Sequence, residues 1–177
     1  MNNEHPADAG HSLTLEPLSL RGYEELPLQA LKDYPSLMAC HQAWLAAQSD
    51  GHLPAVIEVD TLPPEVMPYT MLLDYLPEEA DVRVRIAGLY VGERSHQAGG
   101  GQRLRNFFSE EDARIVFASM RRVAETRQPS LARRSYVALN GTQYTYVRLI
   151  LPLSLDGSTV TGFFKTIEPE TLHMQSV

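Results

Sequence analysis

Hydrophobic residues recur at helical spacing in two segments of the chain, and strand-like runs occupy five others. The first helical segment is SLMACHQAWLAAQSDG, which starts at Ser36 and stops at Gly51. Serine is a preferred helix cap and glycine a common helix stop, so the pattern predicts an amphipathic helix over residues 37–49. We expect Trp44 to lie on the buried stripe of this helix.

The second helical segment, residues 110–127, follows Ser109 and has the clearest pattern in the chain. Asp112 lies three residues after Ser109, as in a capping box, and Pro129 lies beyond the end of the helix. The apolar stripe of this helix consists of Ala113, Val116, Phe117, Met120, Val123 and Ala124. We expect this stripe to pack against the core.

Five segments predict β-strands. Two of them, residues 70–76 and 81–88, are joined by the short turn PEEA and form a predicted hairpin. The other three predict a meander: SLARRSYVAL, then TQYTYVRLILPL after the Asn140-Gly141 turn, then STVTGFFKTIEP after a loop around Asp156. The predicted fold class is therefore α+β: a five-stranded antiparallel sheet with helices inserted between strands 2 and 3, plus an N-terminal amphipathic helix.

The domain boundaries follow from the polarity and the order of these elements. We expect a disordered tail over residues 1–12 and an N-terminal extension over 13–60. The main domain is predicted over residues 61–169, and a C-terminal tail over 170–177. Within the extension, residues 13–34 mix leucines with turn formers and predict no clear element.

The composition excludes several classes of protein. The 177-residue chain is 44% hydrophobic and has a net charge of −7, which argues against a nucleic-acid-binding surface. Cys40 is the only cysteine, so an intramolecular disulfide or a cysteine zinc cluster is ruled out. No apolar run approaches the roughly 20 residues that cross a bilayer, and the N-terminus has no signal-peptide pattern. We therefore expect a cytoplasmic protein with neither a membrane nor a nucleic-acid partner.

The order of elements resembles that of the PAS domain, in which two N-terminal strands, a helical middle and a three-strand meander surround a small cavity. The chain is similar to a family of stand-alone bacterial PAS-like proteins with an ordered set of motifs. Four of these motifs are a Trp-bearing helix, an Asp-x-x-x-Pro link, Leu-Leu-Asp in a first strand and Arg-x-Arg-x-x-Gly in a second. The matching residues are Trp44; Asp60, Pro63 and Pro64; Leu72, Leu73 and Asp74; and Arg83, Arg85 and Gly88. The resemblance covers roughly residues 37–169 and implies that residues 61–169 form a PAS-like domain.

The chain departs from this family at its run of three glycines. Gly101 lies where the family motif Asp-Leu-Thr-Gly ends, but Ala98, Gly99 and Gly100 stand in place of its first three residues. The missing leucine would pack this turn onto the core, so its loss raises the question of whether a cavity persists. We favour a short helix over residues 89–96, and a helical turn in QRLRNFF after the glycines.

The sequence offers little support for an enzyme or a cofactor. The glycine run matches neither GxGxxG nor GxxxxGK[ST], and a flexible joint is favoured over an anion site formed with Arg103 and Arg105. Helix 110–127 lacks a histidine for haem or metal, and Cys40 lies outside the region where a flavin adduct would form. We therefore expect no catalytic residues, no metal and no cofactor. The weakest hypothesis is a small enzyme that uses His96 beside the glycine turn.

Arginines and tyrosines in the predicted strands suggest a ligand site. Arg148 alternates with Tyr144 and Tyr146 on one strand face, which suits a ligand that carries a carboxylate or a phosphate. Alternatively, the strand arginines face solvent or pair with acidic residues, and the apolar helix residues are ordinary core. The predicted ligand-binding residues are Phe107, Val116, Phe117, Met120, Tyr144, Tyr146 and Arg148.

Two functions stay open at this point. The first is a stand-alone PAS-like sensory or regulatory module that binds a small molecule or a protein partner in signal transduction and acts through a downstream protein. Such a module is expected to be a homodimer, with an interface that includes Leu37, Cys40, His41, Trp44 and Leu45. The second is a structural protein-interaction scaffold that has lost its cavity.

Overall fold

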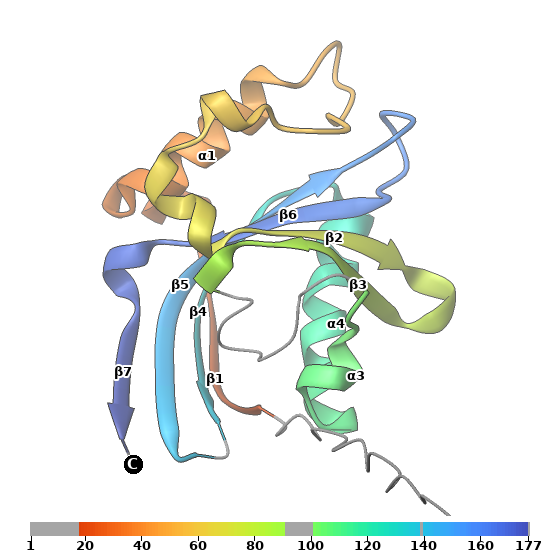
Figure 1. Cartoon of the computed structure of the whole chain (residues 1–177). Helices are drawn as coiled ribbons and strands as arrows, with labels where there is room; N and C mark the ends of the chain where they lie inside the picture. The colour runs from red at the N-terminus through yellow and green to blue at the C-terminus, as the bar shows by residue number, and fades with distance from the viewer. Residues whose placement is uncertain (1–17, 91–100, 139, 177) are drawn as a thin grey trace, which may run out of the picture.

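Seven antiparallel strands form one sheet in the computed structural model, which describes residues 18–90, 101–138 and 140–176 (Figure 1). The strands are β1 (Ser19–Leu26), β2 (Met71–Leu76), β3 (Asp81–Ala87), β4 (Ser130–Val137), β5 (Thr142–Leu153), β6 (Gly162–Ile167) and β7 (His173–Ser176). They lie in the order β1-β4-β5-β6-β2-β3, and β7 pairs with the first part of β5. The predicted α+β class is confirmed.

The sheet has two strands beyond the five that we predicted, which correspond to β2 to β6. β1 lies within residues 13–34, where we predicted no element, and pairs with β4 so that Tyr23 is opposite Arg134. β7 lies within the expected tail, residues 170–177, and pairs with residues 142–145 of β5. Neither strand has the apolar alternation that marks a strand in a sequence, and each is fixed by the strand with which it pairs, β4 for β1 and β5 for β7.

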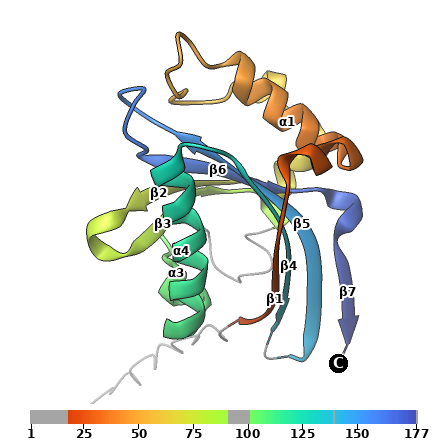
Figure 2. The ribbon, with the colours of Figure 1, turned by 180° about the vertical axis from the view of Figure 1, so that it is seen from behind.

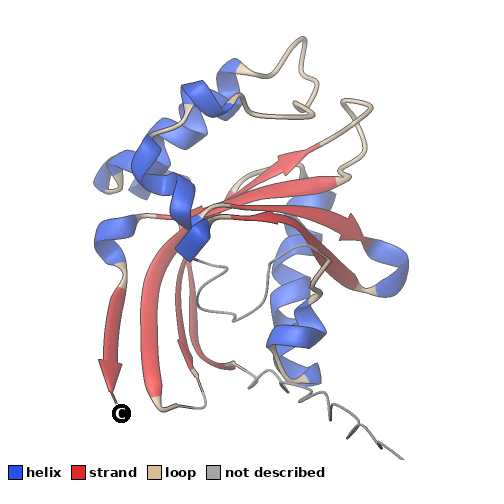
Figure 3. Cartoon of the chain, in the orientation of Figure 1, coloured by secondary structure: helices blue, strands red, loops and turns tan. Residues whose placement is uncertain are grey.

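The helices lie in two groups on opposite sides of the sheet (Figures 1 and 2). The α-helices are α1 (Pro35–Ala46), α3 (Leu104–Phe107) and α4 (Glu110–Thr126), and the 3-10 turns are η1 (Leu28–Asp33), η2 (Val59–Thr61), η3 (Pro64–Tyr69), η4 (Pro77–Glu79) and η5 (Pro169–Thr171). α1 lies on one face of the sheet, and α3 and α4 lie on the other. Figure 3 shows the strands as the layer between them. No helix in the described part of the chain is both long and apolar enough to cross a membrane.

The first long helix is displaced toward the N-terminus from its predicted range. α1 spans Pro35–Ala46 rather than 37–49, and Ser36 is its second residue rather than its cap. A remote carboxylate replaces the local cap: Glu168 accepts hydrogen bonds from the backbone N–H groups of Ser36 at 3.0 Å and Leu37 at 3.2 Å. Glu168 is buried, and its negative charge also suits the positive end of the helix.

The second long helix agrees closely with its prediction. The Ser109 hydroxyl accepts a hydrogen bond from the backbone N–H of Asp112 at 3.2 Å, as a capping serine does. α4 then ends at Arg127, whose backbone has φ +57°. Its buried residues are Val116, Phe117, Met120 and Val123.

The hydrophobic core is divided between a large cluster and a small one. In the large cluster, Trp44 is buried as predicted, and its indole Nε1 donates to the carbonyl of Pro152 at 2.8 Å. The small cluster consists of Tyr136, Tyr146 and Ile167, contributed by β4, β5 and β6. Arg148, on β5 two residues after Tyr146, is buried next to this small cluster.

Candidate functional site

Two arginines are buried side by side on one face of β4 and β5. Arg148 on β5 is 0% exposed and Arg134 on β4 is 3% exposed. The strand register places Arg148 opposite Ala132 and Tyr146 opposite Arg134, so the two arginines are diagonal neighbours on the same face. Arginine is rarely buried in this way unless it is paired with an acid or binds a ligand.

Within residues 18–90, 101–138 and 140–176, no acidic side chain forms an ion pair with either buried arginine. Arg148 donates through Nη1 to the carbonyl and hydroxyl oxygens of Ser130, at 3.3 and 3.2 Å, and through Nη2 to the hydroxyl of Tyr23 at 3.1 Å. Among the described residues, Nε of Arg148 and both Nε and Nη2 of Arg134 have no hydrogen-bond partner. The Tyr23 hydroxyl in turn donates to Glu25 at 3.3 Å, so this acidic residue is linked to Arg148 only through Tyr23.

Each of the two guanidinium groups lies near an aromatic ring. Cζ of Arg134 lies 5.8 Å from the centre of the Phe108 ring, and Cζ of Arg148 lies 5.6 Å from the centre of the Tyr23 ring. These cation–π contacts stabilise the charges and leave Nε of both arginines and Nη2 of Arg134 without a hydrogen-bond partner among the described residues. We refer to Tyr23, Phe108, Ser130, Arg134 and Arg148 as the arginine cluster.

Burial and the neighbouring charge of Arg134 both disfavour the charged form of Arg148. Burial lowers the pKa of Arg148 to about 10, and the positive charge of Arg134 acts in the same direction. Interactions with Tyr23 and Tyr146 act to raise this pKa but do not offset the burial. Because a guanidinium with this pKa is protonated at neutral pH, the site holds two buried positive charges.

The structure separates the predicted ligand-binding residues into two groups. Arg148 and Tyr146 are buried around the small cluster, with Tyr144 partly buried against it. Val116, Phe117 and Met120 instead pack in the large core, with Phe107 partly buried against it. Phe117, for example, stacks on Tyr75 with ring centres 5.9 Å apart. The arginine cluster is therefore built mainly by strands, whereas the α4 residues are core.

The predicted set did not include five residues of this region, namely Arg134, Tyr136, Tyr23, Phe108 and Ser130. A signal for two of them was present, because Arg134 and Tyr136 alternate on β4 in the same way as Tyr146 and Arg148 alternate on β5. Tyr136 stacks on Tyr144 with ring centres 4.9 Å apart and meets Tyr146 edge-on at 5.9 Å. Tyr23 and Phe108 carried no such signal, since their contacts come from the fold alone.

Arg83, Arg85 and Arg133 agree with the alternative prediction, that strand arginines face solvent or pair with acidic residues. Arg83 and Arg85 on β3 both donate to the carboxylate of Asp74, with a distance of 2.8 Å for Arg83. Partial burial acts to raise the pKa of Asp74, but the hydrogen bonds from the two arginines outweigh it and the pKa is lowered. Arg133 on β4 is exposed and pairs with Glu24 at 2.6 Å. Arg134 and Arg148 therefore differ from these three arginines, which are exposed and paired with acidic residues.

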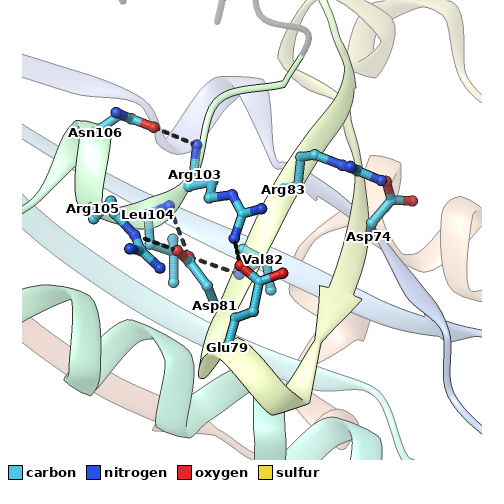
Figure 4. Close-up of polar contacts among 9 residues, drawn as sticks. All are labelled: Asp74, Glu79, Asp81, Val82, Arg83, Arg103, Leu104, Arg105 and Asn106. Atoms are coloured by element: carbon cyan, nitrogen blue, oxygen red, sulfur yellow. Dashed lines mark hydrogen bonds and ion pairs between the residues drawn. The ribbon is translucent and has the colours of Figure 1, made fainter.

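The segment after the glycine run is a structural joint (Figure 4). Asp81 accepts hydrogen bonds from the backbone N–H of Leu104 at 3.1 Å and from Arg105 at 2.9 Å. Arg103 pairs with Glu79, so both arginines that could have held an anion are already engaged. Gly101 has φ +87°, a conformation that favours glycine, and its N–H donates to the carbonyl of Val84 at 2.8 Å. Gly99, Gly100 and His96 lie outside the described residues, as do most of the helix expected over 89–96 and the tail expected over 1–12.

The predicted dimer residues on α1 do not share one exposed surface. Leu37, Cys40 and Trp44 are buried within the chain itself, whereas Leu45 is 47% exposed. His41 is partly buried and stacks on Trp44, and burial lowers its pKa. The three buried residues are therefore unavailable to a partner of the folded chain.

Of two surface grooves near β4, one is lined by a member of the arginine cluster. The larger, of about 280 Å³, lies between the end of α4 and strands β1 and β4 and is lined in part by Glu25 and Ser130. Ser130 accepts a hydrogen bond from Arg148, so one residue that lines this groove also contacts the buried guanidinium. The smaller groove, of about 230 Å³, is lined in part by Arg133 and Tyr146.

Comparison with known proteins assigns no function to this site. No three His, Cys, Asp or Glu side chains in the described ranges gather into a group that could hold a metal ion. No family model, curated protein or solved structure matches the chain. We therefore propose a function from the arginine cluster and from the arrangement of the elements around it.

Proposed function

We propose that this protein is a sensory or regulatory module of the PAS type that binds a small anionic molecule at the arginine cluster. The observation that carries this proposal is the burial of Arg134 and Arg148 side by side with three nitrogen donors unpartnered among the described residues. An unmet buried donor costs about 1–3 kcal/mol, so a fold that retains several of them gains from an acceptor that is supplied from outside.

The order of elements supports the PAS-type assignment. The hairpin β2–β3, the helical middle with α3 and α4, and the meander β4-β5-β6 follow one another along the chain, and β2 pairs with β6 to join the two ends of the series. Gly88 closes the motif Arg-x-Arg-x-x-Gly at a position where a side chain has no room, because an added Cβ would lie 2.2 Å from the carbonyl oxygen of Met67. A module of this kind acts through a downstream protein, which we propose as its partner in signal transduction.

The chemistry of the arginine cluster favours an oxyanion as the ligand. A guanidinium group binds the oxygens of a carboxylate or a phosphate through parallel N–H donors, and such charge-assisted hydrogen bonds are stronger than neutral ones. In the buried setting of Arg134 and Arg148 there is little water to compete for these donors.

Native mass spectrometry of the full chain tests this function. Protein purified without denaturation is expected to carry a small-molecule adduct that is lost in Arg134→Met and Arg148→Met. Arg133→Met is the matched control, because its arginine is on the same strand but exposed and paired with Glu24, and this variant is expected to keep the adduct. The proposal fails if the wild-type mass equals that of the bare chain and no anion raises its melting temperature.

A cavity-free interaction scaffold is the second candidate, and the packing of α4 favours it. Val116, Phe117 and Met120, which we expected to line a cavity, are all buried in the large core. A scaffold would show the bare mass in the same experiment and no stabilisation by anions. The two candidates therefore predict opposite results.

We also propose that the module is a homodimer, in which α1 contributes only its outer surface. Leu45 is the exposed leucine of this helix, whereas the apolar residues of its inner face are already covered. Sedimentation of the wild type should give a dimer, and Leu45→Glu should shift it toward the monomer. A wild-type monomer at high protein concentration contradicts this part of the proposal.

A further inference from the structure

We infer that the ligand of the arginine cluster is a small dianion whose oxygens approach in the plane of the guanidinium groups, as those of a phosphate monoester or a dicarboxylate do. This inference rests on the proposed function and narrows it to one class of ligand. Two observations support it: three guanidinium donors lack a hydrogen-bond partner among the described residues, and two buried charges have no ion pair there.

The free donors lie at the edges of the guanidinium groups. Nε and Nη2 of Arg134 are neighbours on one edge of its guanidinium, and both lack a partner among the described residues. Two adjacent N–H donors match the two oxygens of one carboxylate or phosphate group. Nε of Arg148 adds a third donor from the next strand.

The aromatic contacts of the two arginines leave three donors without partners. Cζ of Arg134 lies 5.8 Å from the centre of the Phe108 ring, and Cζ of Arg148 lies 5.6 Å from the centre of the Tyr23 ring. Among the described residues, neither contact provides an acceptor for the Nε atoms or for Nη2 of Arg134. A ligand whose oxygens reach these three donors can therefore bind with both rings in place.

The number of unpaired charges sets the charge of the ligand. Seven arginines in the described part of the chain form ion pairs with Asp or Glu, and Arg134 and Arg148 are not among them. A monoanion would neutralise one of the two buried charges and leave the other unpaired, which is costly in a site without water. A dianion neutralises both.

Matched ligands that differ mainly in charge provide the test. Methyl phosphate and methyl sulfate share a tetrahedral shape, but methyl phosphate acquires its second charge near about pH 6 whereas methyl sulfate stays monovalent. Succinate and its monoamide, succinamate, form the corresponding dicarboxylate pair. Calorimetric titration uses the full chain after unfolding and refolding in an anion-poor buffer, which removes any retained ligand.

At about pH 7.5, we expect at least one dianion to bind more tightly than its matched monoanion by about tenfold or more, the difference that one charge-assisted hydrogen-bonded pair makes. The pair that shows this preference separates a phosphate from a dicarboxylate ligand. In Arg148→Met the preference should collapse, because one buried charge remains, whereas Arg133→Met should retain it. A pH series with methyl phosphate needs no variant: its affinity should rise from about pH 5.5 to 7.5 while that of methyl sulfate stays constant.

The possible outcomes distinguish failure of the dianion inference from failure of the proposed anion-binding function. If a monoanion binds as tightly as its dianionic partner and Arg134→Met abolishes binding, the dianion inference is overturned and the anion-binding function stands. If none of the four ligands binds and purified protein has the bare mass, the proposed function fails as well.

Discussion

Replacing Arg134 with methionine should stabilise the ligand-free protein. The arginine side chain is 3% exposed, and its Nε and Nη2 atoms have no hydrogen-bond partner among the described residues. At about 1–3 kcal/mol for each unmet donor, these two nitrogens cost about 2–6 kcal/mol. The contact with the Phe108 ring returns about 0.5–2 kcal/mol. Methionine keeps an apolar stem and removes the like charge beside Arg148, so we expect a net stabilisation of about 1–4 kcal/mol.

Urea unfolding, followed by the fluorescence of Trp44, measures this change, since the chain has one tryptophan and it is buried. The protein is first unfolded and refolded so that no ligand remains bound. For a chain of this size, 1 kcal/mol corresponds to about 2–4 °C in Tm, so Arg134→Met should melt roughly 2–16 °C higher than the wild type. Arg133→Met is the control, because loss of its exposed pair with Glu24 should change stability by no more than about 0.5–1 kcal/mol.

A loss of more than about 1 kcal/mol in Arg134→Met, with an unchanged control, would refute this reasoning. Such a loss would mean that the Arg134 guanidinium is satisfied within the fold and serves as a structural support. A gain in stability together with a loss of anion binding is instead the result expected of a site in which function opposes stability.

The remaining predictions concern the structure around the site. Glu168→Ala should destabilise the fold by about 2–5 kcal/mol, because it leaves two backbone N–H groups of α1 without their carboxylate, and Glu168→Gln should lose less; equal losses in urea unfolding would contradict this. Gly88→Ala should cost about 2 kcal/mol or more, because its Cβ would lie 2.2 Å from a backbone oxygen; an unchanged Tm would argue against this packing. Burial raises the pKa of Cys40 to about 12, so its thiol should react with Ellman's reagent at about pH 8 only after unfolding. Hydrogen bonds from two backbone amides lower the pKa of Asp156 from 3.8 to about 2, so its contribution to stability is present above pH 3.8 and lost as the pH falls through about 2; a carboxyl NMR titration with a midpoint near 3.8 would disprove it.

The elements with strong periodicity could be predicted from the sequence, and those fixed by distant partners could not. α4 has its cap, its apolar stripe and its end within twenty consecutive residues, so a local pattern describes it completely. α1 has its apolar stripe in the sequence, but its start is stabilised by Glu168, which no local rule connects to it. β1 has almost no apolar alternation and is a strand because β4 lies beside it.

The arginine cluster could be predicted only in part for the same reason. Alternation groups Arg148 with Tyr146 on β5 and Arg134 with Tyr136 on β4, but it does not show which face of β4 is buried, that of Arg134 or that of Arg133. The structure decides this through β1, since Arg133 reaches Glu24 at the surface while Arg134 lies beneath the Phe108 ring. Burial of a charged side chain depends on what covers it, and that information lies in residues far along the chain.

The remote cap of α1 has a consequence for the order in which the chain can fold during synthesis. Glu168 and Ser36 are 132 residues apart, and Glu24 and Arg133 are 109 residues apart, whereas the β2–β3 hairpin joins Asp74 to Arg83 across only 9 residues. The hairpin can close as soon as it leaves the ribosome, but β1 and α1 must wait until the strands near the C-terminus exist. β1 and α1 leave the ribosome before the strands that complete them, so they are among the last elements of this fold to be completed and are exposed to chaperones as unfolded chain until then.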